Sequence, residues 1–236
     1  MGETKLTFKR YEMKYLLDRQ RYEALRERLD AYITPDTYFK STVCSLYYDS
    51  DDYRLIRHSL DKPVYKEKLR VRSYGTPKAD DTVFVELKKK YKGIIYKRRV
   101  PMSARQAEDY LAGKAPAAED SQMVREIDWF LKTNNVAPRV LISCDREAYV
   151  AKEDRELRIT FDSNLCWRET ELELTEGCYG DMLLADGQVL METKIPGAAP
   201  LWLSRMFSEL EIFPTSFSKY GNCYKNMILN GVIYSA

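Results

Sequence analysis

The sequence contains a single histidine, His58, among 236 residues. A Ser-His or Cys-His catalytic pair therefore has one candidate base at most, and a metal site built from several imidazoles is excluded. The cysteines are Cys44, Cys144, Cys166, Cys178 and Cys223. Their number is odd and none are closely spaced, so we expect reduced thiols with no disulfide framework and no thiolate zinc site. His58 follows an acidic turn, where we expect a partly exposed side chain.

Long apolar runs and a strong net charge are also missing. No apolar run approaches the roughly 20 residues that a helix needs to cross a bilayer, and the opening residues MGETKLTFKRYEMK contain no apolar signal core. We expect a cytoplasmic chain without a membrane segment of its own, for which a membrane protein remains a possible partner. The formal net charge of +2 gives no global signal for binding DNA. No repeat or hinge divides the chain, so residues 1–236 are predicted to form one domain.

What the sequence does contain is a run of three predicted strands between Tyr65 and Val100, which read YKEKLRVRSYG, VFVELKKKYKG and IIYKRRV. Successive side chains of a strand point to opposite faces, so residues two apart share a face. One face of these strands is charged and the other is mainly apolar. The charged face carries Lys68, Arg70, Arg72, Glu86, Lys88, Lys97 and Arg99. Arg98 falls on the apolar face and breaks the pattern.

Three further predicted strands, in residues 6–15, 155–168 and 188–197, show the same alternation. Their charged faces add Arg10, Glu12, Lys14, Arg158, Asp162, Glu192 and Lys194. The charged faces of all six strands together carry ten cations and four anions, although the whole chain is nearly neutral. Solvated sheet faces usually mix the two signs, because like charges on neighbouring strands repel each other.

Residues 41–50 and 138–150 are predicted as two more strands, and the remaining periodic segments as helices. The first helix is expected over residues 19–32, with Asp18 as its N-cap and Pro35 beyond its end. Ser103 and Ser121 are placed to cap the next two helices, which are expected to end near Gly113 and Thr133. Residues 200–210 and 218–231 are also helix-like.

The excess of cations has two interpretations. Each strand taken singly is an ordinary solvated face. If the strands close on themselves, however, the cations line a tunnel that an anion must complete, because unpaired charges are costly to desolvate. Mixed Arg and Lys side chains suit phosphate oxygens. In the absence of His and Cys ligands, carboxylates among these cations would hold a hard Mn²⁺ or Mg²⁺ that bridges phosphates.

The order of the motifs resembles a known family. From about Phe8 to about Asn226 the chain reads YEMKY, KLRVRSYG, VFVELKKK, YKRRV, CDREAY, RITFD, VLMETKIP and SFSKYG. This order resembles the catalytic domain of the vacuolar transporter chaperone (VTC), which makes polyphosphate and belongs to the triphosphate tunnel metalloenzymes, or CYTH-like group. The resemblance implies an α+β fold in which an antiparallel β-barrel forms a tunnel with helices packed outside. It also implies ATP and polyphosphate as ligands, bound through their phosphates.

Site residues follow from this resemblance together with the charged faces. The predicted catalytic residues are Arg70, Arg72, Lys88, Lys97 and Arg146. The predicted substrate-binding residues are Lys14, Arg10, Lys68, Arg99, Arg158, Lys194, Ser218 and Lys219. The resemblance makes Glu192 a ligand of Mn²⁺ or Mg²⁺, and Glu86 and Glu12 are further candidates. Arg146 falls on the same, apolar face of its predicted strand as Val140, Ile142 and Cys144. A bulge or the end of the strand therefore has to turn its side chain toward the phosphate site.

Our leading hypothesis is a metal-dependent polyphosphate polymerase that transfers the γ-phosphate of ATP to a growing chain. The hydrolytic branch of the group typically opens with ExExK, whereas this chain has Arg10, Glu12 and Lys14. An inorganic or nucleoside triphosphatase, with water oriented by Glu12 or Glu86, is the alternative. A non-catalytic protein that binds polyphosphate or RNA is a third candidate. The bases of a bound RNA would need exposed tyrosines on which to stack. However, Tyr11, Tyr15, Tyr47 and Tyr96 mostly fall on the apolar, packing face of the predicted strands.

Overall fold

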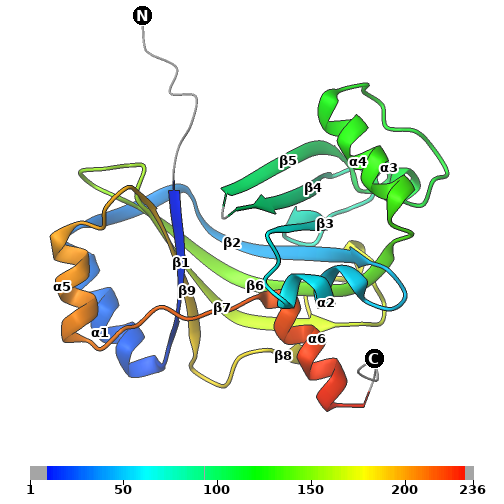
Figure 1. The fold of residues 1–236 in the computed structure, drawn as a ribbon. Helices are drawn as coiled ribbons and strands as arrows, with labels where there is room; N and C mark the ends of the chain where they lie inside the picture. The colour runs from blue at the N-terminus through cyan, green and yellow to red at the C-terminus, as the bar shows by residue number, and fades with distance from the viewer. Residues whose placement is uncertain (1–9, 93, 232–236) are drawn as a thin grey trace, which may run out of the picture. The chain divides into compact units, whose positions relative to one another are not determined.

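The computed structural model describes residues 10–92 and 94–231 (Figure 1). This part of the chain contains nine strands and six α-helices. The strands are β1 (Arg10–Leu17), β2 (Ile33–Asp49), β3 (Tyr65–Tyr74), β4 (Thr82–Tyr91), β5 (Ile94–Ser103), β6 (Ala137–Ala151), β7 (Arg158–Arg168), β8 (Asp181–Met182) and β9 (Val189–Pro196). The helices are α1 (Arg19–Leu29), α2 (Arg54–Leu60), α3 (Ala104–Leu111), α4 (Gln122–Thr133), α5 (Leu201–Glu209) and α6 (Lys219–Leu229). The fold is α+β with a mostly antiparallel sheet, as predicted.

The strands are hydrogen-bonded in the order β1-β9-β7-β6-β2-β3-β4-β5, and β8 pairs with β7. By its internal contacts the chain divides into two compact units, which we describe separately. The first unit is Met1–Ser41, Asp145–Asn164 and Leu184–Phe217, and the second is Thr42–Cys144, Leu165–Leu183 and Ser218–Ala236. The single domain expected over residues 1–236 stays a prediction.

In the first unit, β9 lies between β1 and β7, antiparallel to both. Apolar residues of alternating parity, such as Tyr15 and Phe161, pack with Leu25 of α1 and Leu203 of α5 in one core. The carboxylate of Asp18 caps α1 by accepting the N–H of Arg21 at 2.8 Å, as predicted. Helices α1 and α5 lie side by side (Figure 1), and Tyr32 stacks on Trp202 with ring centroids 4.4 Å apart.

The first helix is shorter than predicted, because α1 ends at Leu29 rather than near Tyr32. Strand β2 correspondingly begins at Ile33, eight residues before the predicted start at residue 41. Pro35 therefore does not act as a helix stop. It lies near the beginning of a long strand, one of the few strand positions that tolerate the missing N–H of proline.

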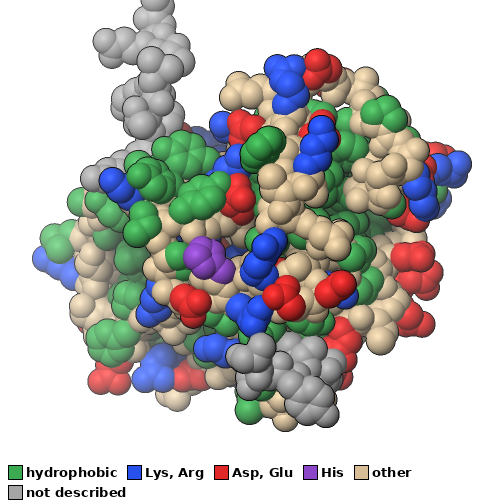
Figure 2. Space-filling model, turned by 45° about the vertical axis from the view of Figure 1, so that its right-hand side comes forward, with side chains coloured by type: hydrophobic (Ala, Val, Ile, Leu, Met, Phe, Trp, Pro, Cys, Tyr) green, Lys and Arg blue, Asp and Glu red, His purple; other side chains and the backbone are tan. Residues whose placement is uncertain are grey.

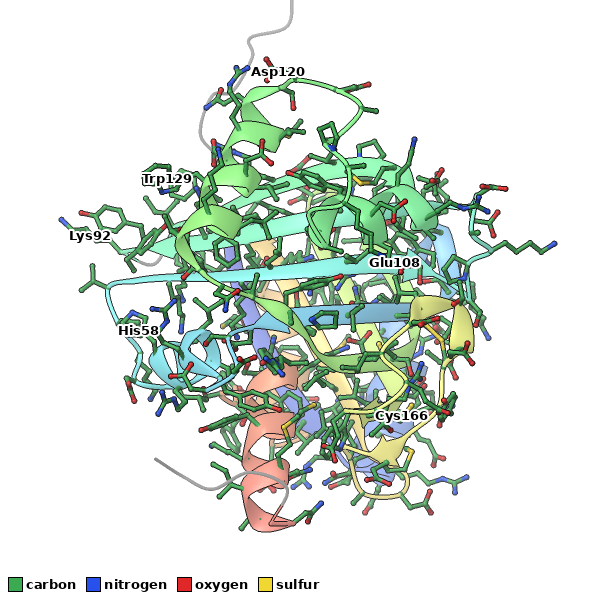
Figure 3. All side chains as sticks on the ribbon, turned by 90° about the vertical axis from the view of Figure 1, so that its right-hand side faces the viewer. His58, Lys92, Glu108, Asp120, Trp129 and Cys166 are labelled. Carbon is green, nitrogen blue, oxygen red and sulfur yellow. A yellow bond between two sulfur atoms is a disulfide. The ribbon has the colours of Figure 1, made fainter. Side chains whose placement is uncertain are left out.

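In the second unit, strands β2 to β5 form an antiparallel meander, and α3 and α4 cover one face of β4 and β5 (Figure 1). Ser103 and Ser121 cap these two helices, as predicted. The core beneath them joins Leu69, Leu87 and Val100 of the strands with Ile127 and Phe130 of α4. Trp129, which precedes Phe130 in α4, is 70% exposed, and its side chain projects away from the sheet (Figure 3).

The only histidine lies in α2 with its side chain exposed (Figure 2), as expected, and its Nε2 is 3.2 Å from the carbonyl oxygen of Tyr65. The expectation of reduced cysteines is wrong for two of the five. Cys44 and Cys178 form a disulfide across 134 positions of the sequence, both within the second unit. The wide spacing concealed this pair, since only the fold brings the two residues together. Cys144, Cys166 and Cys223 are free and buried.

None of the helices in the described ranges combines the length and apolar character that crossing a membrane requires.

Candidate functional site

Three lysines lie directly opposite one another on adjacent strands of the second unit. Lys68 of β3 is paired with Lys88 of β4, and Lys88 is paired with Lys97 of β5. Residues in such positions have Cβ atoms roughly 5 Å apart, and like charges there are destabilising. The charged face that the sequence predicts on β3 to β5 therefore exists, and we call this row of three residues the lysine row.

The adjacent row of the same face is built around a buried carboxylate. Glu86 of β4 lies between Arg70 and Arg99 and is only 1% exposed. Arg70 donates from Nε and Nη2 to Oε2 of Glu86 at 2.8 and 2.7 Å, and Arg99 donates from Nε to Oε1 at 2.6 Å. Lys97 Nζ lies 2.7 Å from the same Oε1. A single carboxylate thus serves three cations.

The cations set the ionisation of this row. Burial would raise the pKa of Glu86, but the charges of Arg70 and Arg72 and the bond from Lys97 outweigh it and hold that pKa far below its usual range. Glu86 is therefore ionised at any pH near neutrality. Its contacts fit a counter-ion that orients the arginines. The role of metal ligand for Glu86 stays a prediction.

Tyr47 of β2 extends this row, since it is paired with Arg70. Arg70 Nη1 donates to the phenol oxygen at 3.0 Å. Burial raises the pKa of Tyr47, but the positive charges of Arg70, Arg72 and Lys68 more than reverse this and leave the pKa at about 8. Assigning Tyr47 to the packing side was thus wrong. The side chain is buried, but among cations, and only the register between β2 and β3 reveals this.

The start of α6 lies against the lysine row. Ser218 caps the helix by accepting the N–H of Gly221 at 3.1 Å, and Lys68 Nζ donates to the same hydroxyl at 3.2 Å. Lys219 Nζ lies 3.0 Å from the Sγ of Cys144. A helix start combines N–H groups with a favourable dipole for anions. The structure thus brings together Ser218 and Lys68, two residues predicted to bind substrate, and Lys219 follows Ser218 at the start of α6.

Arg98, which broke the charge pattern, has a partner on the packing face. Glu126 of α4 accepts from Arg98 Nε at 3.1 Å and from Lys89 Nζ at 3.0 Å. The covering helix therefore supplies the carboxylate that these two residues need. Alternation within β5 alone could not show this.

The first unit has a different charged face, on β1 and β9. Lys14 is paired with Glu192, and Glu12 is paired with Lys194, so residues of opposite charge face each other. Lys14 Nζ also donates to the carbonyl oxygen of Phe217 at 2.8 Å. The Nζ of Lys194 lies 3.6 Å from Oε1 of Glu192.

The neighbouring strand continues this face, because Lys194 is also paired with Arg158 of β7. Arg158 lies 3.6 Å from the carboxylate of Asp36. For Arg10 only the backbone is described, paired with Pro196, and the prediction for its side chain lies outside the described residues.

Arg146 of β6 pairs with Asp162 of β7 in the first unit. Its Nε and Nη2 donate to the two carboxylate oxygens at 2.6 and 2.7 Å, and Asp162 is 1% exposed. The idea that the strand ends near Arg146 is wrong, because β6 continues to Ala151. Residues 140–144 of this strand are buried on both parities, so hydrophobicity could not tell which side is charged.

Comparison with known proteins identifies the family. A match to the VTC domain covers residues 9–228. The chain belongs to the VTC domain family. No curated protein matches its sequence.

Two solved structures share the fold of this VTC domain. One is a proposed adenylate cyclase from Bacillus halodurans, with 12% identity, a TM-score of 0.55, and coverage of 88% of this chain and 92% of that one. The other is a proposed adenylyl cyclase from Hippeastrum, described as having a dominant triphosphatase activity. It shows 14% identity, a TM-score of 0.55, and coverage of 93% of this chain and 95% of that one. At these identities the likeness establishes the fold alone.

Two of the predicted metal ligands lie in the first unit. Glu192 and Glu12 are on adjacent strands and one row apart, which is a diagonal pair within reach of a shared ligand. No cluster of three or more Asp, Glu, His or Cys side chains suited to a metal is found among residues 10–92 and 94–231. Mg²⁺ and Mn²⁺ fit such a sparse set, because Mg²⁺ usually binds through one or two carboxylates and takes its other oxygens from water and phosphates.

Proposed function

We propose that this VTC domain is a metal-dependent polyphosphate polymerase that transfers the γ-phosphate of ATP to the end of a polyphosphate chain. The observation that carries the proposal is the lysine row beside a carboxylate already occupied by three cations. Such a face is stable with a compact, multiply charged anion on it. Membership of the VTC family supports phosphate chains as that anion, and it supports a tunnel formed by an antiparallel β-barrel as the setting.

The proposed reaction needs no side-chain nucleophile. Phosphoryl transfer depends mainly on positioning and on neutralising charge, so the terminal oxygen of the chain attacks the γ-phosphorus directly while the bond from that phosphorus to the β-phosphate oxygen breaks and ADP leaves. Arg70, Arg72, Lys88 and Lys97 would neutralise the phosphate oxygens. Glu86 keeps two arginines oriented, and Asp162 does the same for Arg146. Glu192 and Glu12 would hold Mn²⁺ or Mg²⁺, which lowers the charge of phosphate oxygens when bound.

A triphosphatase is the second candidate. The description of the Hippeastrum protein, which shares the fold, is the observation that favours it. The sequence counts against it, because Arg10 stands at the first position of the ExExK pattern typical of the hydrolytic branch.

Incubation of the purified protein with ATP and Mn²⁺, followed by ³¹P NMR, separates these functions. A polymerase produces signals of internal phosphates together with ADP. Free orthophosphate without internal phosphates would show a triphosphatase. Unchanged ATP would contradict both enzymatic proposals and point to a phosphate-binding protein, whose affinity for tripolyphosphate would survive EDTA.

A further inference from the structure

A fully buried carboxylate joins three elements of the second unit behind the candidate phosphate site. Asp49, the last residue of β2, has no exposed surface. Its Oδ1 accepts the N–H groups of Ser50 and Leu55 at 2.8 and 2.9 Å, and its Oδ2 accepts that of Ile56 at 3.0 Å. Leu55 and Ile56 belong to the first turn of α2, so Asp49 fixes this helix to the end of the strand.

The remaining bond to this carboxylate comes from α6. The hydroxyl of Tyr220 donates to Oδ2 of Asp49 at 2.9 Å, and Tyr220 is 3% exposed. Burial, together with the neighbouring charge of Asp49, raises the pKa of Tyr220 well above its ordinary value, so the phenol keeps its proton and acts as a donor. Tyr220 directly follows Lys219 and the capping residue Ser218, whose hydroxyl accepts from Lys68 of the lysine row.

The ring of Tyr220 also contacts the site. It stacks on Tyr47 with centroids 4.9 Å apart and an interplanar angle of 25°, and Tyr47 in turn accepts from Arg70. The next residue, Gly221, packs closely: a Cβ there would lie 2.9 Å from Leu60 of α2. The start of α6 is therefore held from two sides, by a stacked ring and by a bond to a buried carboxylate.

We propose that Tyr220 is a positioning residue for phosphate binding. Its hydroxyl, anchored on Asp49, fixes the first turn of α6 so that Ser218 and Lys219 meet the ligand beside Lys68. The inference rests on the proposed function, since it assumes that this surface binds phosphates. It goes further by assigning a role to a side chain that does not itself reach the ligand.

The test measures binding of inorganic tripolyphosphate by isothermal titration calorimetry. Tyr220→Phe keeps the stacked ring and removes only the hydroxyl. Loss of the bond to the buried carboxylate loosens the first turn of α6, so we expect the dissociation constant to rise by about tenfold. Tyr53→Phe is the matched control. Tyr53 also contacts α6, with the centroid of its ring 5.6 Å from that of Tyr224. The Tyr53→Phe substitution likewise removes one hydroxyl and should leave tripolyphosphate binding unchanged. Asp49 is unsuited to the test because it also caps α2.

A double-variant cycle separates positioning from general stability. In the background Ser218→Ala with Lys219→Ala, the Tyr220→Phe change should cost less than about twofold in affinity, because the groups it positions are gone. An equal loss in both backgrounds, or unchanged binding by Tyr220→Phe alone, overturns the inference. A different result would contradict the proposed function itself. In that case the wild-type protein would not bind tripolyphosphate at all, and Ser218→Ala with Lys219→Ala would change nothing.

Discussion

The charged sheet faces of the two units differ in their balance of positive and negative charges. In the first unit, residues of opposite charge face each other across β1 and β9, with Lys14 opposite Glu192 and Glu12 opposite Lys194. In the second unit, like charges face each other along the lysine row, and one carboxylate, Glu86, serves three cations.

The balance of charge on each face determines which ion it can bind. Where opposite charges alternate, the face is nearly neutral, and its carboxylates remain suited to a cation. Where cations outnumber carboxylates, binding a polyanion relieves repulsion. We therefore propose a metal site in the first unit and a phosphate site in the second, and each proposal can be tested within its own unit.

The largest expected effect is on metal-dependent turnover. Glu192→Gln should lower Mn²⁺-dependent turnover by at least about 100-fold, because loss of a ligand removes several kcal/mol of charge stabilisation. The measurement is kcat over a titration with Mn²⁺. Glu23→Gln, an exposed carboxylate on α1 of the same unit, is the control and should keep full activity. Full activity of Glu192→Gln would contradict a metal site that depends on Glu192.

The second effect is on stability. Glu86→Gln leaves Arg70, Lys97 and Arg99 without their shared carboxylate, so the free energy of unfolding should fall by about 3 kcal/mol, as measured by urea denaturation. Glu126→Gln removes a carboxylate from the opposite, packing face, where it is 21% exposed, and should cost about 1 kcal/mol. Equal losses would contradict the role of Glu86 as the shared counter-ion of three cations.

The sequence predicted the strands and the charged faces well, because the period of two records which side of β3, β4 and β9 is buried. It could not predict features that depend on register or on distant partners. Tyr47 was misplaced because its pairing with Arg70 is a property of two strands. Arg98 and Lys89 need Glu126 from a helix more than 25 positions away.

The third effect is on the affinity of the lysine row for phosphates. Lys88→Ala should weaken tripolyphosphate binding by about tenfold, since a charged hydrogen bond is lost. Lys89→Ala is a matched control on the same strand, because Lys89 points to the other face and pairs with Glu126. Calorimetry at low and high salt should show the difference shrinking as salt screens the charges. Equal affinities of the two variants at low salt would contradict a phosphate site on the lysine row.

The smallest effect depends on pH. The pKa of Tyr47, about 8, lies below its ordinary value of 10.0, so between these values the folded state binds fewer protons than the unfolded state. The free energy of unfolding should therefore rise with pH across this window, relative to Tyr47→Phe. The phenolate also competes with phosphate for Arg70, so tripolyphosphate affinity should fall by roughly threefold above pH about 8. A Tyr47→Phe variant with the same pH profile would show that another group titrates.

The disulfide has a consequence for how the chain can be cut. Cys44 and Cys178 lie in two separate stretches of the second unit, and residues 145–164 of the first unit are inserted between them. The bond therefore closes a covalent ring of backbone that includes β3, β4, β5, β6 and β7. A single protease cut anywhere inside that ring opens it without separating the fragments, which part only after reduction. The nicked and intact chains would differ on a gel only when a reductant is present.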